Sequence, residues 1–230
     1  MRCLLYLLFS TIVLPSRLGA EILAQAPIDT AVYAVSYVEV TPSAKGTAVA
    51  ALKQYRDTSR KDEGYVRFEL LEQIGRPGHF AILETWTDQK AFDAHGKAEH
   101  TKQMLSQLQP IRLSDYDQRP YKTLTAGPPP AAANDRAIYA LTHVDIAGPQ
   151  NDAPGLLKRL AETSRKDEGC LRFDVLQHTA RANHFTIVEA WQSQKSLDAH
   201  AAAAHTRQSR DGLGPITGSP VDGRLYKVVE

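Results

Sequence analysis

The sequence has few cysteines, almost no net charge and no long apolar run, and each of these absences excludes a class of protein. Its 230 residues contain two cysteines, Cys3 and Cys170, which is too few for a disulfide framework. Lys and Arg total 27 against 26 Asp and Glu, so the net charge of +1 predicts no nucleic-acid or anionic-membrane partner. There is also no G-x-G-x-x-G fingerprint for a tightly bound flavin or nicotinamide.

The one strongly apolar stretch is N-terminal and short. Residues 4–14, LLYLLFSTIVL, are too few to span a bilayer comfortably, and they lie between a charged start and a small-residue exit. This pattern predicts a secretory signal peptide over residues 1–26, with Ala20, Ala24 and Ala26 as alternative cleavage positions. We therefore expect an exported protein, periplasmic or secreted, with no stable membrane insertion after cleavage. An uncleaved membrane anchor is the alternative.

The string SRKDEG occurs twice, at residues 59–64 and 164–169, and marks an internal duplication. With a shift of 105 residues, positions 79–103 align with 184–208 without a gap, and 14 of these 25 positions are identical. The repeated string itself is predicted to end a helix and turn the chain at its glycine, with solvated charges and no catalytic role. The predicted organisation is a signal peptide at 1–26, domain 1 at 27–124, a Pro/Ala-rich linker at 125–136 and domain 2 at 137–230.

Along each unit the spacing of apolar residues switches between the period of about two that is typical of strands and the period of about 3.6 that is typical of helices. In the first copy this order predicts strands at 31–40, 65–73, 79–86 and about 119–124, and helices within 41–64 and at 88–108. The order is β-α-β-β-α-β, so the predicted fold class is α+β with two ferredoxin-like domains. The second and third strands are apolar on both faces, which requires a second layer. The other copy supplies it, and the two domains are predicted to form an intramolecular pseudo-dimer of two sheets, as a sandwich or a barrel.

The third strand and the following helix hold the candidate site residues. Period two places Glu84 and Trp86 on one face of the strand, and Arg67 on the neighbouring strand is the expected partner of Glu84. The alternatives are a buried ion pair that only sets strand register, tryptophans that are only core anchors, and solvent-exposed histidines. The candidates are His79, Glu84, Trp86, His95 and His100, and in the second copy His184, Glu189, Trp191, His200 and His205, with Arg67 and Arg172 as carboxylate partners.

No metal site is predicted from these residues. His95 and His100 are five apart, about 140° around one continuous helix, and no Cys, Asp or Glu complements them at ligand spacing. A neutral histidine beside an apolar pocket is instead a candidate proton acceptor.

These motifs resemble the antibiotic biosynthesis monooxygenase family. The resemblance is carried by DEGCLRFDVLQ and HFTIVEAWQSQKSLDAH in the second copy, by DEGYVRFELLE and HFAILETWTDQKAFDAH in the first, and by the second histidine five residues on. It covers about residues 31–122 and 137–227 and implies a dimeric α/β-barrel fold, here as a fused pair.

The resemblance also implies a function. Some family members are cofactor-free monooxygenases of quinols or polycyclic phenols, in which the deprotonated substrate itself reduces O₂. For this chain it implies no cofactor, with a small aromatic substrate and O₂ as partners. His95 and His200 would handle protons, Trp86 and Trp191 would pack on the substrate, and the remaining candidates would orient it. Relatives that degrade haem use an Asn on the first strand with a Trp and a His on the second helix. The Asn and the Trp are absent here, so haem degradation is disfavoured, whereas haem binding stays open as a less favoured alternative.

Three alternatives remain open at this level. One is a non-catalytic module that binds or scavenges an aromatic ligand, and another is a structural protein whose pockets its own side chains fill. Further assembly into a homo-oligomer is also open. The two copies differ at the end of the second helix, KQMLSQL against RQSRDGLG, and we expect the first copy to hold the better-formed site.

Overall fold

The computed structural model describes residues 30–128, 136–147 and 152–229. The predicted signal peptide and most of the predicted linker lie outside these residues. The first unit contains β1 (Val32–Glu39), η1 (Pro42–Ala44), α1 (Lys45–Ser59), β2 (Tyr65–Gln73), β3 (His79–Trp86), α2 (Gln89–Lys97), α3 (Glu99–Leu108) and β4 (Asp117–Thr125). The second contains β5 (Ile138–Asp145), α4 (Ala153–Ser164), β6 (Cys170–His178), β7 (His184–Trp191), α5 (Gln194–Ala201), α6 (Ala204–Leu213), η2 (Gly214–Ile216) and β8 (Asp222–Val228).

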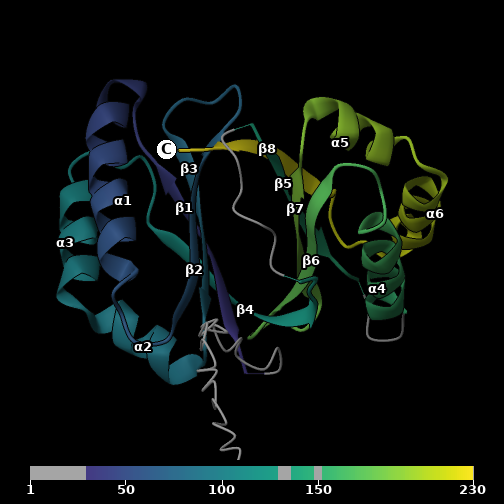
Figure 1. Ribbon diagram of the computed structural model, residues 1–230, viewed down its shortest axis with the longest axis horizontal. Helices are drawn as coiled ribbons and strands as arrows, with labels where there is room; N and C mark the ends of the chain where they lie inside the picture. Colours follow the sequence, from purple (N-terminus) through teal and green to yellow (C-terminus); the bar gives the residue numbers. More distant parts are fainter. Residues whose placement is uncertain (1–29, 129–135, 148–151, 230) are drawn as a thin grey trace, which may run out of the picture.

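The strands close into one barrel in the order β1-β3-β2-β8-β5-β7-β6-β4, with the helices of the two units on opposite sides (Figure 1). The last strand of each unit pairs on one side with the first strand of its own unit and on the other side with the second strand of the other unit, so β4 lies between β1 and β6 and β8 lies between β5 and β2. The predicted α+β pseudo-dimer of ferredoxin-like units is therefore confirmed, in its barrel form. Among the described residues, no helix is long and apolar enough to cross a membrane.

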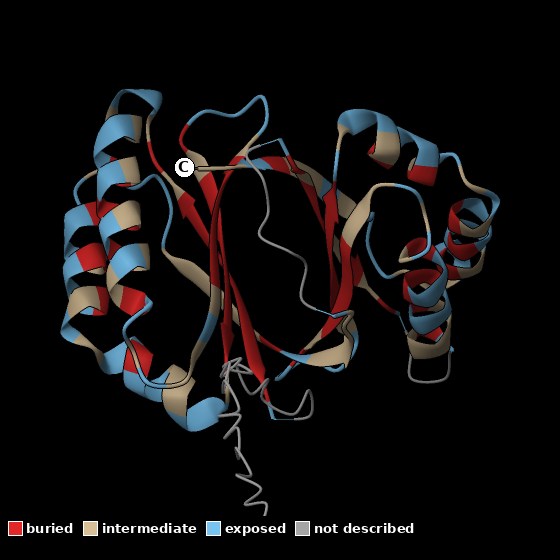
Figure 2. Ribbon diagram, in the orientation of Figure 1, coloured by how far each residue is buried: buried red, intermediate tan, exposed pale blue. Residues whose placement is uncertain are grey.

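The second and third strands of each unit are buried on both faces over most of their length, as their composition predicts (Figure 2). One face of β3 presents Phe80 and Ile82 to the helices, where they join the core of the first unit. The other face presents Ala81 and Leu83 to the barrel interior, where side chains of both units form a shared core. Continuity of this shared core makes the two units one packed structure.

The predicted pairs Arg67–Glu84 and Arg172–Glu189 are wrong. The pairing of β2 with β3 is regular from the turn as far as Arg67, and it places Phe68 opposite Glu84 and Arg67 opposite Thr85. A bulge shifts the register only beyond this stretch, between Arg67 and Tyr65. Directly opposed residues share a face, which turns Arg67 into the barrel and Glu84 toward the helices. The same shift occurs in β6.

Inside the barrel the arginines form a buried ion-pair network across the two units. Arg172 donates from Nη1 to Glu69 over 2.7 Å and from Nε to Asp174 over 2.6 Å, and Arg67 donates to the other oxygen of Glu69. Burial alone would raise the pKa of Glu69, but Arg172 and Arg67 outweigh it and hold that pKa below its ordinary value. Arg67 and Arg172 therefore join the domains and do not line a substrate site.

The predicted continuous helix at 88–108 is interrupted. α2 begins after Asp88, whose side chain accepts from the Ala91 amide, and it ends at Lys97. Ala98 is extended, with φ −63° and ψ 152°, and α3 starts at Glu99. The break changes the relative direction of the side chains on either side of it, which decides the geometry of the candidate site.

Candidate functional site

A cavity of about 510 Å³ opens between the sheet and the helices of the second unit. This volume is in the range of small-molecule sites. Its wall is mostly apolar, with a few polar groups that converge on one side. The apolar lining includes Val144, Leu160, Phe173, Ile187, Leu197 and Leu213, and the polar lining includes Glu189, His200, Thr206, Ser209 and Arg210.

The equivalent hollow of the first unit holds only about 10 Å³. Larger side chains occupy the space there: Tyr55, Met104 and Tyr116 stand where the second unit has Leu160, Ser209 and Val221. Tyr55 and Met104 are each only 1% exposed. The expectation that the first copy holds the better-formed site is therefore wrong. The polar end of the second copy's second helix, which suggested a degenerate site, instead leaves the cavity open, because Ser209 is smaller than Met104.

Glu189 is the buried carboxylate of this cavity. It lies on β7 and points toward the helices, and its Oε2 accepts a hydrogen bond from the Trp191 indole Nε1 over 2.8 Å. Burial raises the pKa of Glu189 to about 7, although the Trp191 hydrogen bond and the charge of Arg210 act in the opposite direction. A carboxyl group with this pKa exchanges protons near neutral pH, as a general acid or base requires.

His200 on α5 completes the polar side of the cavity. Its Nδ1 lies 2.8 Å from Asp167 Oδ2, and its Nε2 lies 3.8 Å from Glu189 Oε2. Burial lowers the pKa of His200, and the nearby Asp167 only partly offsets this. The imidazole is thus neutral at pH 7, and a proton on Nδ1 held by Asp167 leaves the Nε2 lone pair facing Glu189.

The two tryptophans lie behind the histidines and do not line the cavity. Trp191 stacks on His200 with ring centroids 4.6 Å apart, and Trp86 stacks on His95 at 4.2 Å. Both indoles are fully buried. The predicted aromatic wall for the substrate does not fit this geometry. Trp191 instead positions Glu189 and His200, and Phe173 supplies an aromatic ring in the cavity lining.

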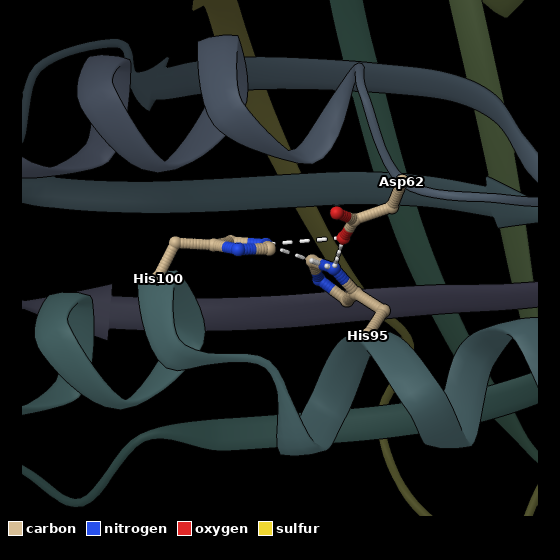
Figure 3. Close-up of side chains that lie close together, drawn as sticks. All are labelled: Asp62, His95 and His100. Atoms are coloured by element: carbon tan, nitrogen blue, oxygen red, sulfur yellow. Dashed lines mark hydrogen bonds and ion pairs between the residues drawn. The ribbon is translucent and has the colours of Figure 1, made fainter.

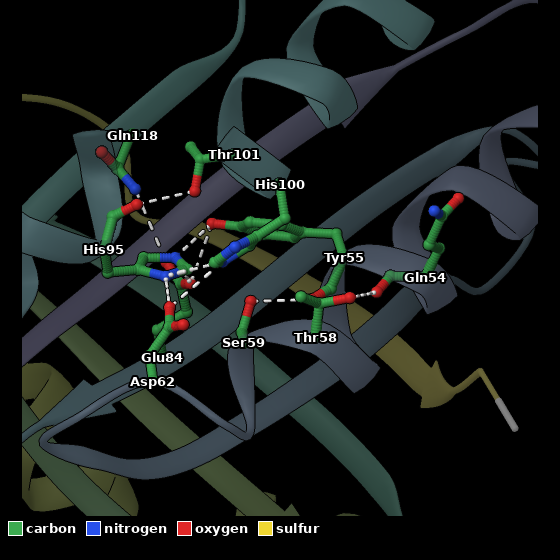
Figure 4. Close-up of polar contacts among 10 residues, drawn as sticks. All are labelled: Gln54, Tyr55, Thr58, Ser59, Asp62, Glu84, His95, His100, Thr101 and Gln118. Atoms are coloured by element: carbon green, nitrogen blue, oxygen red, sulfur yellow. Dashed lines mark hydrogen bonds and ion pairs between the residues drawn. The ribbon is translucent and has the colours of Figure 1, made fainter. Parts of the chain in front are cut away.

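In the first unit the equivalent groups are bonded to one another (Figure 4). Tyr55 donates to Glu84 Oε1 over 3.2 Å, and its hydroxyl lies 2.6 Å from His95 Nε2. His95 Nε2 is also 3.1 Å from Glu84 Oε1. Burial lowers the pKa of His95, but its contacts with Glu84 and Asp62 outweigh burial, so the net pKa is raised. Glu84 and His95 therefore form a closed buried network.

Asp62, within the repeated SRKDEG string, reaches both histidines of the first unit (Figure 3). Its Oδ2 lies 2.7 Å from His95 Nδ1 and 3.1 Å from His100 Nε2. The break at Ala98 brings the two imidazoles together, which a continuous helix would prevent. Asp167, His200 and His205 repeat the cluster in the second unit. The prediction that the charges of SRKDEG are solvated is wrong for this aspartate, and so is the premise that no acid complements the histidine pair.

His79 and His184 lie away from both clusters. They begin β3 and β7, whereas Trp86 and Trp191 end these strands. His79 Nδ1 lies 3.2 Å from Glu39, and His184 Nδ1 contacts Asp145. His184 lines a separate polar cavity of about 380 Å³. His79 and His184, which were predicted to help orient the substrate, therefore lie at the opposite ends of their strands from Trp86 and Trp191.

Comparison with known proteins agrees with the fold and the repeat. The family model described as antibiotic biosynthesis monooxygenase (ABM) matches residues 31–107 and 149–211, which is more than half of the chain. The chain belongs to this family. Its two matched segments correspond to the two ABM units of the barrel, and the family resemblance predicted from the motifs is confirmed.

Individual relatives are distant. A Bacillus subtilis (strain 168) protein named "Putative monooxygenase YcnE" is 28% identical over 65 residues, which are 28% of this chain and 68% of YcnE. A solved structure from Fusobacterium nucleatum, called a "putative monooxygenase", has a TM-score of 0.78 at 18% identity, covering 87% of this chain and 93% of its own. Another so described, from Lactobacillus acidophilus NCFM, has a TM-score of 0.70 at 13% identity, covering 86% and 94%. These two structures share the tandem fold.

Proposed function

We propose that the second ABM domain is a cofactor-independent monooxygenase site that oxidises a small quinol or phenol with O₂. One observation carries the proposal: a largely apolar cavity of about 510 Å³ contains one buried carboxylate, Glu189, whose pKa is raised to about 7. A phenol needs a base to become a phenolate, and a water-poor pocket strengthens every interaction with the resulting anion.

In this mechanism Glu189 takes the phenolic proton, and the neutral His200, whose Nε2 lies 3.8 Å away, is the second acceptor in the same wall. The phenolate reduces O₂, a carbon–oxygen bond forms on the ring, and the O–O bond then breaks with loss of water. For a phenol with a free ring position, phenol plus O₂ gives quinone plus H₂O. The atoms and electrons balance with the substrate as the only reductant.

The groups around the base suit a developing negative charge. Arg210 brings a guanidinium to the cavity, and Thr206 and Ser209 bring hydroxyls. Arg210 stands where the first unit has Leu105, and Ser209 where it has Met104. Preorganised donors aimed at a developing anion are usually the largest catalytic contribution. The polar groups that distinguish the second copy are thus the ones this chemistry requires.

The experiment is O₂ uptake by the purified protein with a panel of hydroquinones and phenols. Replacing Glu189 by Gln removes the base and keeps the acceptor for Trp191, so uptake should fall by about 10²–10⁴-fold. The matched control is Glu72→Gln, a buried carboxylate outside the cavity lining that contacts Lys45. Glu72→Gln should keep wild-type uptake. Retention of an aromatic ligand in native mass spectrometry with no uptake by wild type would instead establish a binding module.

We further propose that this domain works outside the cytoplasm, because the N-terminal sequence is typical of a secretory signal. N-terminal sequencing of the protein recovered from the extracytoplasmic fraction tests this. A mature chain that starts within residues 21–27 is expected, and recovery of the intact N terminus from the cytoplasm would contradict it.

A further inference from the structure

Three nitrogen and oxygen atoms converge at the break between α2 and α3 of the first unit. They are Asp62 Oδ2, His95 Nδ1 and His100 Nε2, and they come from the turn after α1, the end of α2 and the start of α3 (Figure 3). The distances are 2.7 Å from Asp62 to His95, 3.1 Å from Asp62 to His100 and 3.4 Å between the two histidine nitrogens. Each atom therefore lies within hydrogen-bond distance of the other two.

This triangle has nearly the size that a small divalent cation requires. Donors held about 2.0–2.2 Å from an ion are about 3 Å apart at octahedral angles and about 3.3–3.6 Å apart at tetrahedral angles. The three observed separations fall within a few tenths of an ångström of this range. Small rotations of the side chains would open the triangle, without any movement of the helices.

A second layer of contacts fixes His95 in the orientation that a metal ligand needs. Its other ring nitrogen, Nε2, lies 2.6 Å from the Tyr55 hydroxyl and 3.1 Å from Glu84 Oε1. A proton on Nε2 satisfies both contacts, and a metal ion would take the place of the Nδ1 proton that faces Asp62. Metal-bound histidines usually donate their second nitrogen to a carboxylate in this way.

The second unit repeats the three ligand types but not the supporting contacts. Leu160 replaces Tyr55, and Glu189 bonds to Trp191 and stays 3.8 Å from His200 Nε2. His200 therefore lacks the hydrogen bonds that fix its counterpart, and it lines an open cavity. The two copies therefore differ in structure: the first holds the closed Asp62–His95–His100 cluster, and the second holds the cavity proposed for the substrate.

We propose that Asp62, His95 and His100 bind one divalent transition-metal ion per chain, of the class represented by Zn²⁺ and Co²⁺. Two imidazoles and one carboxylate suit borderline ions and not Mg²⁺ or Ca²⁺, which prefer oxygen ligands. His100 and Asp62 are partly exposed, with side chains 15% and 24% accessible, so water can complete the coordination. The ion ties the turn after α1 to the break between α2 and α3.

The test is metal binding by the full chain without a polyhistidine tag. Isothermal titration with Zn²⁺ should give one equivalent per chain, and Co²⁺ should give the visible absorption of a site with nitrogen ligands. Asp62→Asn and His100→Gln should each lower the Zn²⁺ affinity at least tenfold and abolish the Co²⁺ spectrum. Mg²⁺ should not compete at a hundredfold excess. Circular dichroism shows whether each variant retains the wild-type fold.

The matched controls are Asp167→Asn and His205→Gln, the same changes in the second unit. Both should keep one equivalent of Zn²⁺ at wild-type affinity. Absence of Zn²⁺ binding by wild type would overturn the proposal and leave the cluster as a hydrogen-bonded network. Two equivalents, one lost in each set of variants, would overturn the argument that the Tyr55 and Glu84 contacts select the first unit. Because the site is not in the substrate cavity, its failure leaves the proposed oxidation untouched.

Discussion

Glu189→Gln should stabilise the protein at pH 8 while it abolishes activity. Burial raises the pKa of Glu189 to about 7 from an ordinary value near 4.5. Above pH 4.5 the unfolded chain releases this proton, whereas the folded protein holds it up to pH 7. The folded state therefore binds more protons, and its stability falls as pH rises through this interval. The shift of about 2.5 units corresponds to about 3 kcal/mol.

Glutamine has no proton to lose and still accepts from Trp191. The unfolding free energy of Glu189→Gln should therefore equal that of wild type at pH 4.5 and exceed it by up to about 3 kcal/mol at pH 8. Urea unfolding at several pH values measures this difference, in which all other titrating groups cancel. A difference that does not change with pH would refute the assignment of a raised pKa to Glu189.

The equivalent change in the first unit should act in the opposite direction. Glu84 lies between Tyr55 and His95 and has a hydrogen-bonding role that glutamine fills only in part. Glu84→Gln should lower the unfolding free energy by about 1–3 kcal/mol at pH 6, since it leaves buried partners less well satisfied. Stabilisation by both changes would mean that the two units do not differ in the way described.

Three further changes test the remaining parts of the structure. The double variant Leu160→Tyr/Ser209→Met copies the first unit's side chains into the cavity and should abolish substrate binding. Its unfolding free energy in urea should differ from that of wild type by less than about 1.5 kcal/mol. Unchanged substrate binding would contradict the cavity's role. Arg172→Met leaves the buried Asp174 without its arginine and Glu69 with Arg67 alone, and it should lower the unfolding free energy by about 3–5 kcal/mol in the same assay. An unchanged unfolding free energy would show that the Arg172 ion pairs do not stabilise the barrel. Gly64→Ala should lower the unfolding free energy by about 1–3 kcal/mol, because φ is +80° at this position and the new methyl would overlap the side chain of Ala91. The control is Gly46→Ala, which adds a methyl in open space on α1 and should leave the unfolding free energy unchanged or raise it.

The fold was predictable from the sequence because it depends on periodicity and on the duplication. The alternation in the strands, the two apolar faces of β3 and the 105-residue shift are all properties of residue order. The same order also predicted correctly that Glu84 and Trp86 share a face with Phe80 and Ile82. The turn glycines Gly64 and Gly169 have φ +80° and +78°, as their place after the first helix predicts.

The details of the site were not predictable, because they depend on strand register and on a local break in a helix. The register of β2 against β3 places Arg67 on the opposite face from Glu84 and so removes the expected partner of Glu84. The extended residue Ala98 has no proline or capping side chain to signal it, yet it decides that His95 and His100 meet. The signal of the cavity in the sequence is the smaller side chain at two aligned positions, where Leu160 and Ser209 replace Tyr55 and Met104.

Incorporation of labelled oxygen tests the central claim most directly. With ¹⁸O₂ and an accepted quinol or phenol, wild type should place one labelled atom in the quinone and form one quinone per O₂ consumed. Glu189→Gln should lose this incorporation, and Glu72→Gln should retain it. Unlabelled product, hydrogen peroxide in place of oxygenated product, or labelling that does not depend on Glu189 would contradict a monooxygenase site in the second domain.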